Sequence, residues 1–199
     1  MRIVLASNNA GKLAELQALF APLGVELVRQ GELGIDEAEE PFITFVENAL
    51  TKARHASRAA SLPALADDSG LCVDALGGAP GVLSARYATL FGEPKSDADN
   101  NRVLLRELQG QADRRARFVC VLVAVRHADD PEPLIAFGRW QGEITEAPRG
   151  TGGFGYNPVF FDPAVGSTAA EMSTEDKNRL SHRAAAARQM LDQMQAVWM

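Results

Sequence analysis

Six residues near the N-terminus combine main-chain amides with one cationic side chain. They stand between an apolar run at residues 2–6 and a helical pattern from residue 13: Ser7, Asn8, Asn9, Ala10, Gly11 and Lys12. The first N–H groups of a helix are unpaired and the helix dipole is positive there, so this segment could bind phosphate oxygens. It is not a Walker motif, because Ala6 replaces the leading glycine and Leu13 the hydroxyl residue. A capped helix start with a solvated lysine explains the segment equally well.

Two adjacent aspartates, Asp67 and Asp68, follow an apolar run at residues 62–66. Neighbouring side chains on a strand point to opposite sides, so only one of the two can face a given cleft. A carboxylate facing a phosphate-binding loop is a suitable Mg²⁺ ligand, or a base that activates water. Glu39 and Glu40 offer a second anionic source for the same ion. A turn in which the aspartates bond to the backbone is the alternative.

The segment at residues 150–155 reads G-T-G-G-F-G and formally fits the dinucleotide-binding pattern G-x-G-x-x-G. That assignment fails, because a strand-like run follows the segment where a helix is required. The glycines instead allow the backbone to approach a flat ligand while Phe154 or Tyr156 stacks on it. A glycine-rich hairpin loop with core aromatics remains open as an alternative.

Polar and basic residues also gather near the start of the last predicted helix: Lys177, Ser181, His182 and Arg183. On a straight helix their side chains point in different directions, so spacing alone does not bring them together. A solvated helix face is the simpler interpretation.

These segments require elements that position them. Apolar periodicity predicts strands at residues 2–6, 25–28, 62–66 and 71–73, the last two separated by residues 67–70, and helices at residues 13–20, 45–60, 96–108 and from 173 or 174 onward. Residues 117–125 and 134–144 suit a long antiparallel hairpin, residues 77–95 an ordered loop, and residues 159–161 a short strand. The sequence therefore predicts an α/β fold: a mixed, twisted sheet in a single domain spanning 1–199, with two lobes flanking a central cleft, an extended β-hairpin and a C-terminal helix.

Composition limits the classes of function. The 199 residues are 46% hydrophobic and 23% charged, which supports a folded core and argues against disorder. The net charge of -6 argues against nucleic acid polymers and anionic membranes as partners. No stretch approaches the ~18 apolar residues of a membrane span. Cys72 and Cys120 lie in strand-like runs and suit buried, reduced thiols, so we expect a cytoplasmic protein.

Six segments, taken in order along nearly the whole chain, resemble the inosine triphosphate pyrophosphatases, also called dITP/XTP pyrophosphatases, which remove deaminated purine nucleotides from the nucleotide pool. The segments are S-N-N-A-G-K at 7–12, F-V-E-N-A with K-A at 45–53, A-D-D-S-G-L at 66–71, G-A-P-G with S-A-R-Y at 78–87, G-G-F-G-Y-N-P at 152–158, and S-H-R at 181–183.

The resemblance implies a Mg²⁺-dependent homodimer. It would hydrolyse ITP, dITP or XTP between the α- and β-phosphates to a nucleoside monophosphate and pyrophosphate. By this likeness Asp68 is the catalytic base and a metal ligand, Glu40 is a second metal ligand, and residues 7–12 bind the triphosphate. The remaining implied substrate contacts are Ser69, Phe154, Gly155, Tyr156, Asn157, Lys177, His182 and Arg183. Phe154 would stack on the base, and the His182–Arg183 pair would lie near its 6-oxo edge.

One position departs from the family pattern. Residue 157 is Asn where the family usually has Asp, so an amide that both donates and accepts replaces a fixed charge. If the side chain at this position reads the base or orients Lys177, selectivity among ITP, XTP and GTP changes.

Two other functions compete with this interpretation. The same fold could act on pyrimidine or modified nucleotides, although the segment at 154–157 with His182 and Arg183 favours 6-oxo purines. The protein could also bind a metal–nucleotide complex without catalysis, but the presence of Asp68 in an otherwise complete motif argues against it.

Overall fold

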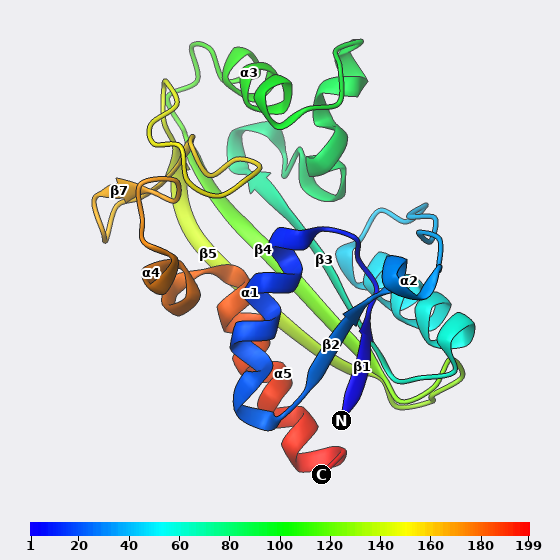
Figure 1. Ribbon diagram of the computed structural model, residues 1–199. Coiled ribbons are helices and arrows are strands. Elements are labelled where there is room, and N and C mark those ends of the chain that lie inside the picture. The colour runs from blue at the N-terminus through cyan, green and yellow to red at the C-terminus, as the bar shows by residue number, and fades with distance from the viewer. The chain divides into compact units, whose positions relative to one another are not determined.

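The computed structural model describes residues 1–199 and shows helices and strands that alternate along the first third of the chain (Figure 1). The strands are β1 (Arg2–Leu5), β2 (Glu26–Arg29), β3 (Ala64–Val73), β4 (Arg115–Val125), β5 (Leu134–Ile144), β6 (Phe160–Asp162) and β7 (Ser167–Thr168). The α-helices are α1 (Ala10–Phe20), α2 (Phe45–Ala60), α3 (Asp97–Glu107), α4 (Thr174–Leu180) and α5 (His182–Val197). Short 3-10 helices cover Ala21–Leu23, Gln30–Leu33, Asp74–Leu76 and Gly81–Phe91.

All seven strands belong to one sheet in the order β2-β1-β3-β4-β5-β6-β7. β1 runs parallel to both β2 and β3, with Val4 opposite Ala64, whereas β6 runs antiparallel to both β5 and β7. The sheet is therefore mixed. Neighbouring strands β4 and β5 form the expected hairpin, so the predicted α/β class is confirmed.

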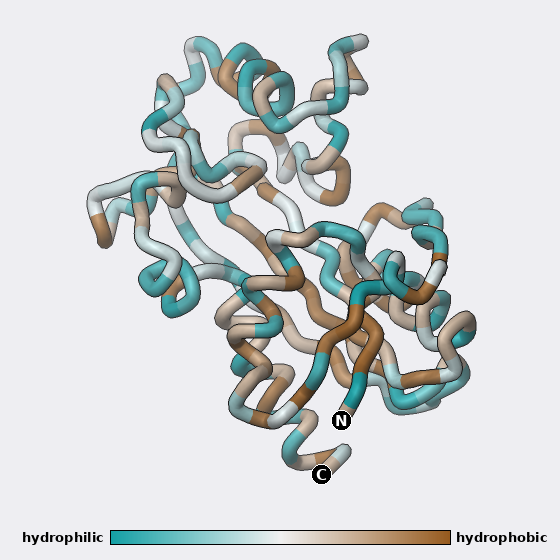
Figure 2. Tube along the Cα trace, viewed as in Figure 1, coloured by the Kyte–Doolittle hydropathy of each residue, from teal (hydrophilic) through white to brown (hydrophobic).

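The chain divides into two compact units, each assembled from separate segments. Unit 1 comprises Met1–Asp68, Cys120–Gly138 and His182–Met199, and unit 2 comprises Ser69–Val119 and Arg139–Ser181. Each unit has a hydrophobic core of its own. The central strands of the sheet are mostly brown, the hydrophobic end of the scale, in Figure 2. The predicted central cleft stays a prediction.

Helices α1 and α5 pack against each other in unit 1 (Figure 1). Their buried residues Leu16 and Met190 share a core with Leu65 of β3 and with Cys120 of β4. The odd-numbered side chains of this part of β3 therefore face α1 and α5, and the even-numbered ones face the other side of the sheet. Cys72 and Cys120 are buried free thiols, as expected. No helix combines the length and the apolar character needed to cross a membrane.

The expected separation of residues 62–66 from residues 71–73 is wrong. Ala64–Val73 forms one uninterrupted strand, and Asp67 and Asp68 lie in its interior. Aspartate is disfavoured in strands, but β3 lies between β1 and β4, and lysine side chains pair with both carboxylates. Tertiary pairing therefore overrides the local preference of the sequence.

Two other sequence expectations need correction. The segment 77–95 was expected as an ordered loop, but most of it is a 3-10 helix at Gly81–Phe91, kinked at Arg86. The single C-terminal helix is two helices, because Ser181 adopts an extended conformation (φ -66, ψ 158) between α4 and α5. The second correction matters for the site, since it changes the direction of every side chain after residue 181.

Candidate active site

The loop before α1 is shaped by its own side chains. Asn9 caps the helix, since its Oδ1 accepts from the Lys12 N–H at 3.0 Å. Ser7 accepts from the Asn9 N–H at 3.2 Å through its hydroxyl oxygen. Asn8 ties the loop to Gly31, whose N–H donates to Asn8 Oδ1 at 3.0 Å. Asn8, Asn9 and Ala10 are exposed, so the helix start is capped and is also open to a ligand.

The aspartate Asp67 is the centre of a buried ion network on the α1 and α5 side of the sheet. Lys12 Nζ donates to its Oδ1 at 2.6 Å, and Arg183 Nε donates to its Oδ2 at 2.7 Å. Arg183 also donates to Glu15 of α1 at 2.6 Å. Burial by itself would raise the pKa of Asp67, but Arg183 and then Lys12 outweigh it, so this pKa lies well below its usual range. Asp67 is therefore a fixed anion.

The next residue, Asp68, meets a different cation. Lys52 of α2 donates from Nζ to Asp68 Oδ1 at 2.8 Å and to Glu40 Oε1 at 2.9 Å. Burial raises the pKa of Asp68 more than Lys52 lowers it, so the carboxyl titrates above its usual range. Burial by itself would lower the pKa of Lys52. The negative charges of Asp68 and Glu40 together outweigh burial, so the pKa of Lys52 lies above its ordinary value. The expected alternation of the two aspartates is confirmed, since each has its own partners.

The two cation sites meet at one main-chain oxygen. Lys52 Nζ donates to the carbonyl oxygen of Asp67 at 2.9 Å, and Lys12 Nζ lies 3.5 Å from the same oxygen. Lys12 forms its ion pair with the carboxylate of Asp67, whereas Lys52 forms the ion pair with Asp68. The peptide group between the two aspartates therefore links the two sites.

The carboxylates around Lys52 suit Mg²⁺. Asp68 Oδ2 is buried and has no hydrogen-bond partner, while Oδ1 is held by Lys52. Glu40 shares the same ammonium group, so the two acidic side chains converge. No three or more His, Cys, Asp or Glu side chains are placed so that they could hold a metal ion together. Mg²⁺ is usually held by one or two carboxylates together with phosphate oxygens and water, and that is the donor set available here.

A second group of predicted site residues lies within unit 2. Lys177 Nζ stands 5.8 Å from the centroid of the Phe154 ring, in cation–π geometry. Tyr156 is buried, and its hydroxyl donates to the Ser84 carbonyl oxygen at 2.8 Å, so this ring is fixed in the core. Of the two aromatic residues considered for stacking, the half-buried Phe154 is therefore the remaining candidate.

Asn157 is also buried and close to Lys177. Both side chains lie over Gly153: a Cβ added there would be 2.0 Å from Asn157 Nδ2 and 3.1 Å from Lys177 Nζ. Gly153 has φ +77, and the side chain of Asn157 occupies the space that any larger residue would need. The amide at residue 157 therefore packs beside Lys177.

The interpretation of residues 182–183 as part of a solvated helix face is wrong. His182 begins α5 and is 8% exposed, and Arg183 is 3% exposed. The turn at Ser181 redirects α5 so that its first residues pack on β5, where Gly138 leaves no room for a Cβ: such an atom would be 1.8 Å from the His182 carbonyl oxygen. Ser69 is half-buried in β3, within unit 2.

Three residues of the ion network were missing from the sequence-based list of site residues: Lys52, Asp67 and Glu15. Lys52 could have been recognised, because it lies on the face of α2 that also buries Ala49 and Ala56, where a charge needs a partner. No local pattern in the sequence indicates that Asp67 and Glu15 belong to this ion network, since their partner Arg183 is far away along the chain.

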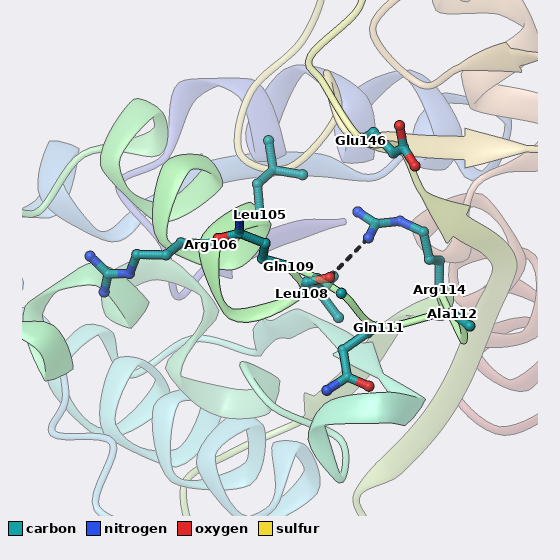
Figure 3. Close-up of a pocket in the computed structure, with 9 residues that line it drawn as sticks. Leu105, Arg106, Leu108, Gln109, Gln111, Ala112, Arg114 and Glu146 are labelled. Atoms are coloured by element: carbon teal, nitrogen blue, oxygen red, sulfur yellow. Dashed lines mark hydrogen bonds between the residues drawn. The ribbon is translucent and has the colours of Figure 1, made fainter.

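A separate cavity of about 590 Å³ lies in unit 2, beside the end of α3 (Figure 3). None of the predicted site residues lines it. Its cation Arg114 donates to three main-chain carbonyl oxygens, those of Leu108, Ile144 and Thr145. Figure 3 shows Arg106 directed away from the space between the other labelled side chains. We therefore do not assign the nucleotide to this cavity.

Comparisons with known proteins identify the family of this chain. The sequence profile of the Ham1 family matches residues 3–193. The dITP/XTP pyrophosphatase of Ralstonia nicotianae is 68% identical over 97% of this chain and 96% of its own. The dITP/XTP pyrophosphatase of Methylibium petroleiphilum is 65% identical, with 100% of both chains covered. The structure of a HAM1 protein from Coxiella burnetii superposes with a TM-score of 0.91 at 45% identity, covering 99% of this chain and 100% of that one. The chain belongs to the Ham1 family.

Proposed function

We propose that this protein is a nucleoside triphosphate pyrophosphatase that hydrolyses deaminated purine nucleotides, namely ITP, dITP and XTP, to the nucleoside monophosphate and pyrophosphate. The curated relatives named above carry the name dITP/XTP pyrophosphatase. The observation that supports this function best is the convergence of Lys12 and Lys52 on one carbonyl oxygen, next to a carboxylate oxygen that has no partner.

Binding of the triphosphate is assigned to the loop at residues 7–12. Its main-chain N–H groups stand at the positive end of the α1 dipole, and the loop residues Asn8, Asn9 and Ala10 are exposed. Lys12 adds a full positive charge at the first turn of the helix. A polyphosphate needs such a local cationic site, because the protein as a whole is anionic.

Activation of water is assigned to Asp68. Lys52 holds Oδ1, so the carboxylate is fixed in orientation and Oδ2 is left to accept a proton from water. Its raised pKa makes it a stronger base than an ordinary carboxylate. The water oxygen forms a new bond to phosphorus, the bond between the α- and β-phosphate groups breaks, and pyrophosphate leaves.

Mg²⁺ would be held by Asp68 and Glu40 together with phosphate oxygens. When bound, it supplies charge neutralisation to the polyphosphate. Both carboxylates already meet at a cation, the ammonium group of Lys52. The electrostatics of the site therefore favour positive charge between them.

Recognition of the base is assigned to Phe154, with Lys177 over its ring and Asn157 beside it. Buried donors that pair with a 6-oxo group would be left unpaired against the 6-amino group of adenine. The site should therefore reject ATP. His182 and Arg183 are assigned to the same recognition by family likeness, and Arg183 acts in part through Asp67, to which it is bound.

The test is a substrate panel with purified protein and Mg²⁺, in which pyrophosphate release is measured from ITP, dITP, XTP, GTP, ATP, UTP and dTTP. We expect turnover of ITP, dITP and XTP to exceed that of ATP by about 10²-fold or more. Fastest turnover of UTP or dTTP would instead indicate a pyrimidine nucleotide pyrophosphatase. Binding of ITP without turnover would indicate a nucleotide-binding module. Chelation of the metal should abolish release of pyrophosphate, and unchanged activity would remove Mg²⁺ from the proposal.

The homodimer and the cytoplasmic location also belong to this proposal. They rest on the resemblance to the pyrophosphatase family, and the free thiols Cys72 and Cys120 suit a reducing compartment. Light scattering of the purified protein measures the first, and fractionation of cells that express it measures the second. A monomer at micromolar concentration would remove the dimer from the proposal.

A further inference from the structure

Helix α3 of unit 2 binds both backbone polar groups of Gly155, which lies in the loop that carries Phe154. Asp97 of α3 accepts from the Gly155 N–H at 2.7 Å through its Oδ2. Asn101, one turn later on the same helix, donates from Nδ2 to the Gly155 carbonyl oxygen at 2.9 Å. Residues i and i+4 share one face of a helix, so Asp97 and Asn101 can both bind Gly155 from the same helix.

The start of α3 is itself well fixed. Ser96 caps the helix by accepting from the Asp99 N–H at 3.0 Å. Asn100 accepts from the Ala88 N–H at 2.8 Å, which ties α3 to the preceding 3-10 helix. Helix α3 therefore holds Asp97 and Asn101, the two side chains that contact the loop, in fixed positions.

The loop around Phe154 needs external hydrogen bonds to fix its conformation, because it is rich in glycine. Gly153 and Gly155 flank Phe154 with φ values of +77 and +62, so the backbone on both sides of the ring is glycine in the left-handed region. A Cβ added at Gly155 would meet no heavy atom within 4 Å, so the space on that side of the residue is open. Hydrogen bonds to Asp97 and Asn101 hold both backbone polar groups of Gly155.

The amide of Asn101 has one paired and one unpaired polar group. Asn101 is 7% exposed, and its Oδ1 is buried without a hydrogen-bond partner. The orientation of the amide is settled by Gly155, because the carbonyl oxygen of Gly155 can pair only with the NH₂ group. An unpaired buried carbonyl destabilises a fold, so the contact with Gly155 indicates a role other than stability.

We propose that Asp97 and Asn101 are positioning residues that set the orientation of the Phe154 ring for stacking on the purine base. This inference rests on the proposed function. The two side chains act on binding of the base through the Gly155 peptide, and they leave the phosphate-binding and water-activating groups of unit 1 unchanged. Loss of either contact therefore weakens binding of the nucleotide more than it slows hydrolysis.

The test compares Asn101→Leu and Asp97→Ala with Asp99→Ala, a control that removes an acid from the same turn of α3 without a contact to the loop. We expect Asn101→Leu to raise KM for ITP about tenfold, and Asp97→Ala, whose side chain is exposed, about threefold. Values of kcat and inhibition by pyrophosphate, which has no base, should stay within about twofold. Asp99→Ala should lower Tm and leave KM unchanged.

A double-mutant cycle shows whether the effect passes through the ring. In a Phe154→Ala background, Asn101→Leu should raise KM no further, because the ring that it orients is gone. Asn101→Leu should also keep Tm at or above that of the wild type. Unchanged KM in both variants, additive effects with Phe154→Ala, or weaker inhibition by pyrophosphate would each overturn the inference. A wild-type enzyme that turns over ITP in the same assay keeps these results separate from a failure of the proposed function.

Discussion

The ammonium groups of Lys12 and Lys52 both reach the carbonyl oxygen of Asp67, at 3.5 and 2.9 Å. The two lysines come from different helices, α1 and α2, and each also pairs with its own aspartate on β3. Like charges repel at this range, so the arrangement is stable only because the carboxylates of Asp67 and Asp68 lie beside them. The result is a compact cluster of paired charges at the end of the loop assigned to the triphosphate.

Replacement of Asp68 by Asn tests the assignment of the base. Asn at this position keeps the shape of the side chain but cannot take a proton from water, so we expect kcat for ITP to fall by at least about 10²-fold while nucleotide binding survives. Turnover and equilibrium binding of ITP are measured on the same preparation. Asp74→Asn, which removes a partly exposed acid just beyond the same strand, is the control. Near-normal turnover of Asp68→Asn would require another base.

Replacement of Lys52 by Met tests the role of the residue that bridges Glu40 and Asp68. Without the ammonium group the Asp68 carboxylate loses its fixed orientation, and the two acids repel. We expect kcat to fall by about 10²-fold or more, and Mg²⁺ to raise Tm more in the variant than in the wild type.

The control for Lys52 is Arg58→Met. Arg58 lies on the same helix, and its side chain is 64% exposed in a surface ion pair with Asp129. Equal kcat values for Lys52→Met and Arg58→Met would remove Lys52 from the site.

Replacement of Arg183 by Met tests the buried ion network. The Arg183 side chain is 4% exposed and the Asp67 side chain is fully buried. Replacement of Arg183 therefore removes one of the two cations, Arg183 and Lys12, that pair with the Asp67 carboxylate. Breaking a buried pair in this way costs about 3–5 kcal/mol of unfolding free energy, which denaturant titration measures. Arg188→Met, at an exposed position of the same helix, should cost less than about 0.5 kcal/mol. A similar small change at Arg183 would contradict the network.

Replacement of Asp130 by Ala tests the connection between β4 and β5. The buried carboxylate accepts from the Arg126 and Glu132 N–H groups and from the Arg126 guanidinium group. We expect the variant to lose about 2–3 kcal/mol of unfolding free energy at neutral pH. Asp129→Ala removes the neighbouring acid, whose side chain is 87% exposed, and should cost less than about 1 kcal/mol.

The pairing of Arg126 with Asp130 also predicts that the free energy of unfolding depends on pH. The side-chain hydrogen bond from Arg126 holds the pKa of Asp130 below its usual range, against the opposing effect of burial. A depressed native pKa contributes stability that is complete above the unfolded value near 4 and is lost as pH falls through the native pKa. The difference in unfolding free energy between wild type and Asp130→Ala should therefore shrink as pH falls from about 5 to about 2. A constant difference over this range would show that the carboxylate is not the stabilising group.

The sequence by itself determined the elements whose patterns are local. The first strand and helix, α2, α3 and the β4–β5 hairpin were predicted from apolar spacing, cap residues and turns, and the α/β class follows from their order. The segments expected to carry chemistry were found by residue type, because carboxylates, lysines at helix starts and glycine-rich loops have few alternatives in phosphate chemistry. Asp68 and the loop at residues 7–12 belong to this group.

Only the tertiary structure decided how the charges pair. Strand β3 continues through four residues that favour a turn, because the strands on both sides and the lysines paired with its carboxylates stabilise it. Arg183 reaches Asp67 across 116 positions of the sequence, and a bend at Ser181 directs it there. Ion pairs of this kind depend on which surfaces pack together, and no local pattern records that. Helical spacing therefore gave the wrong environment for His182 and Arg183, and pairing Lys12 with Asp67 needed the folded chain.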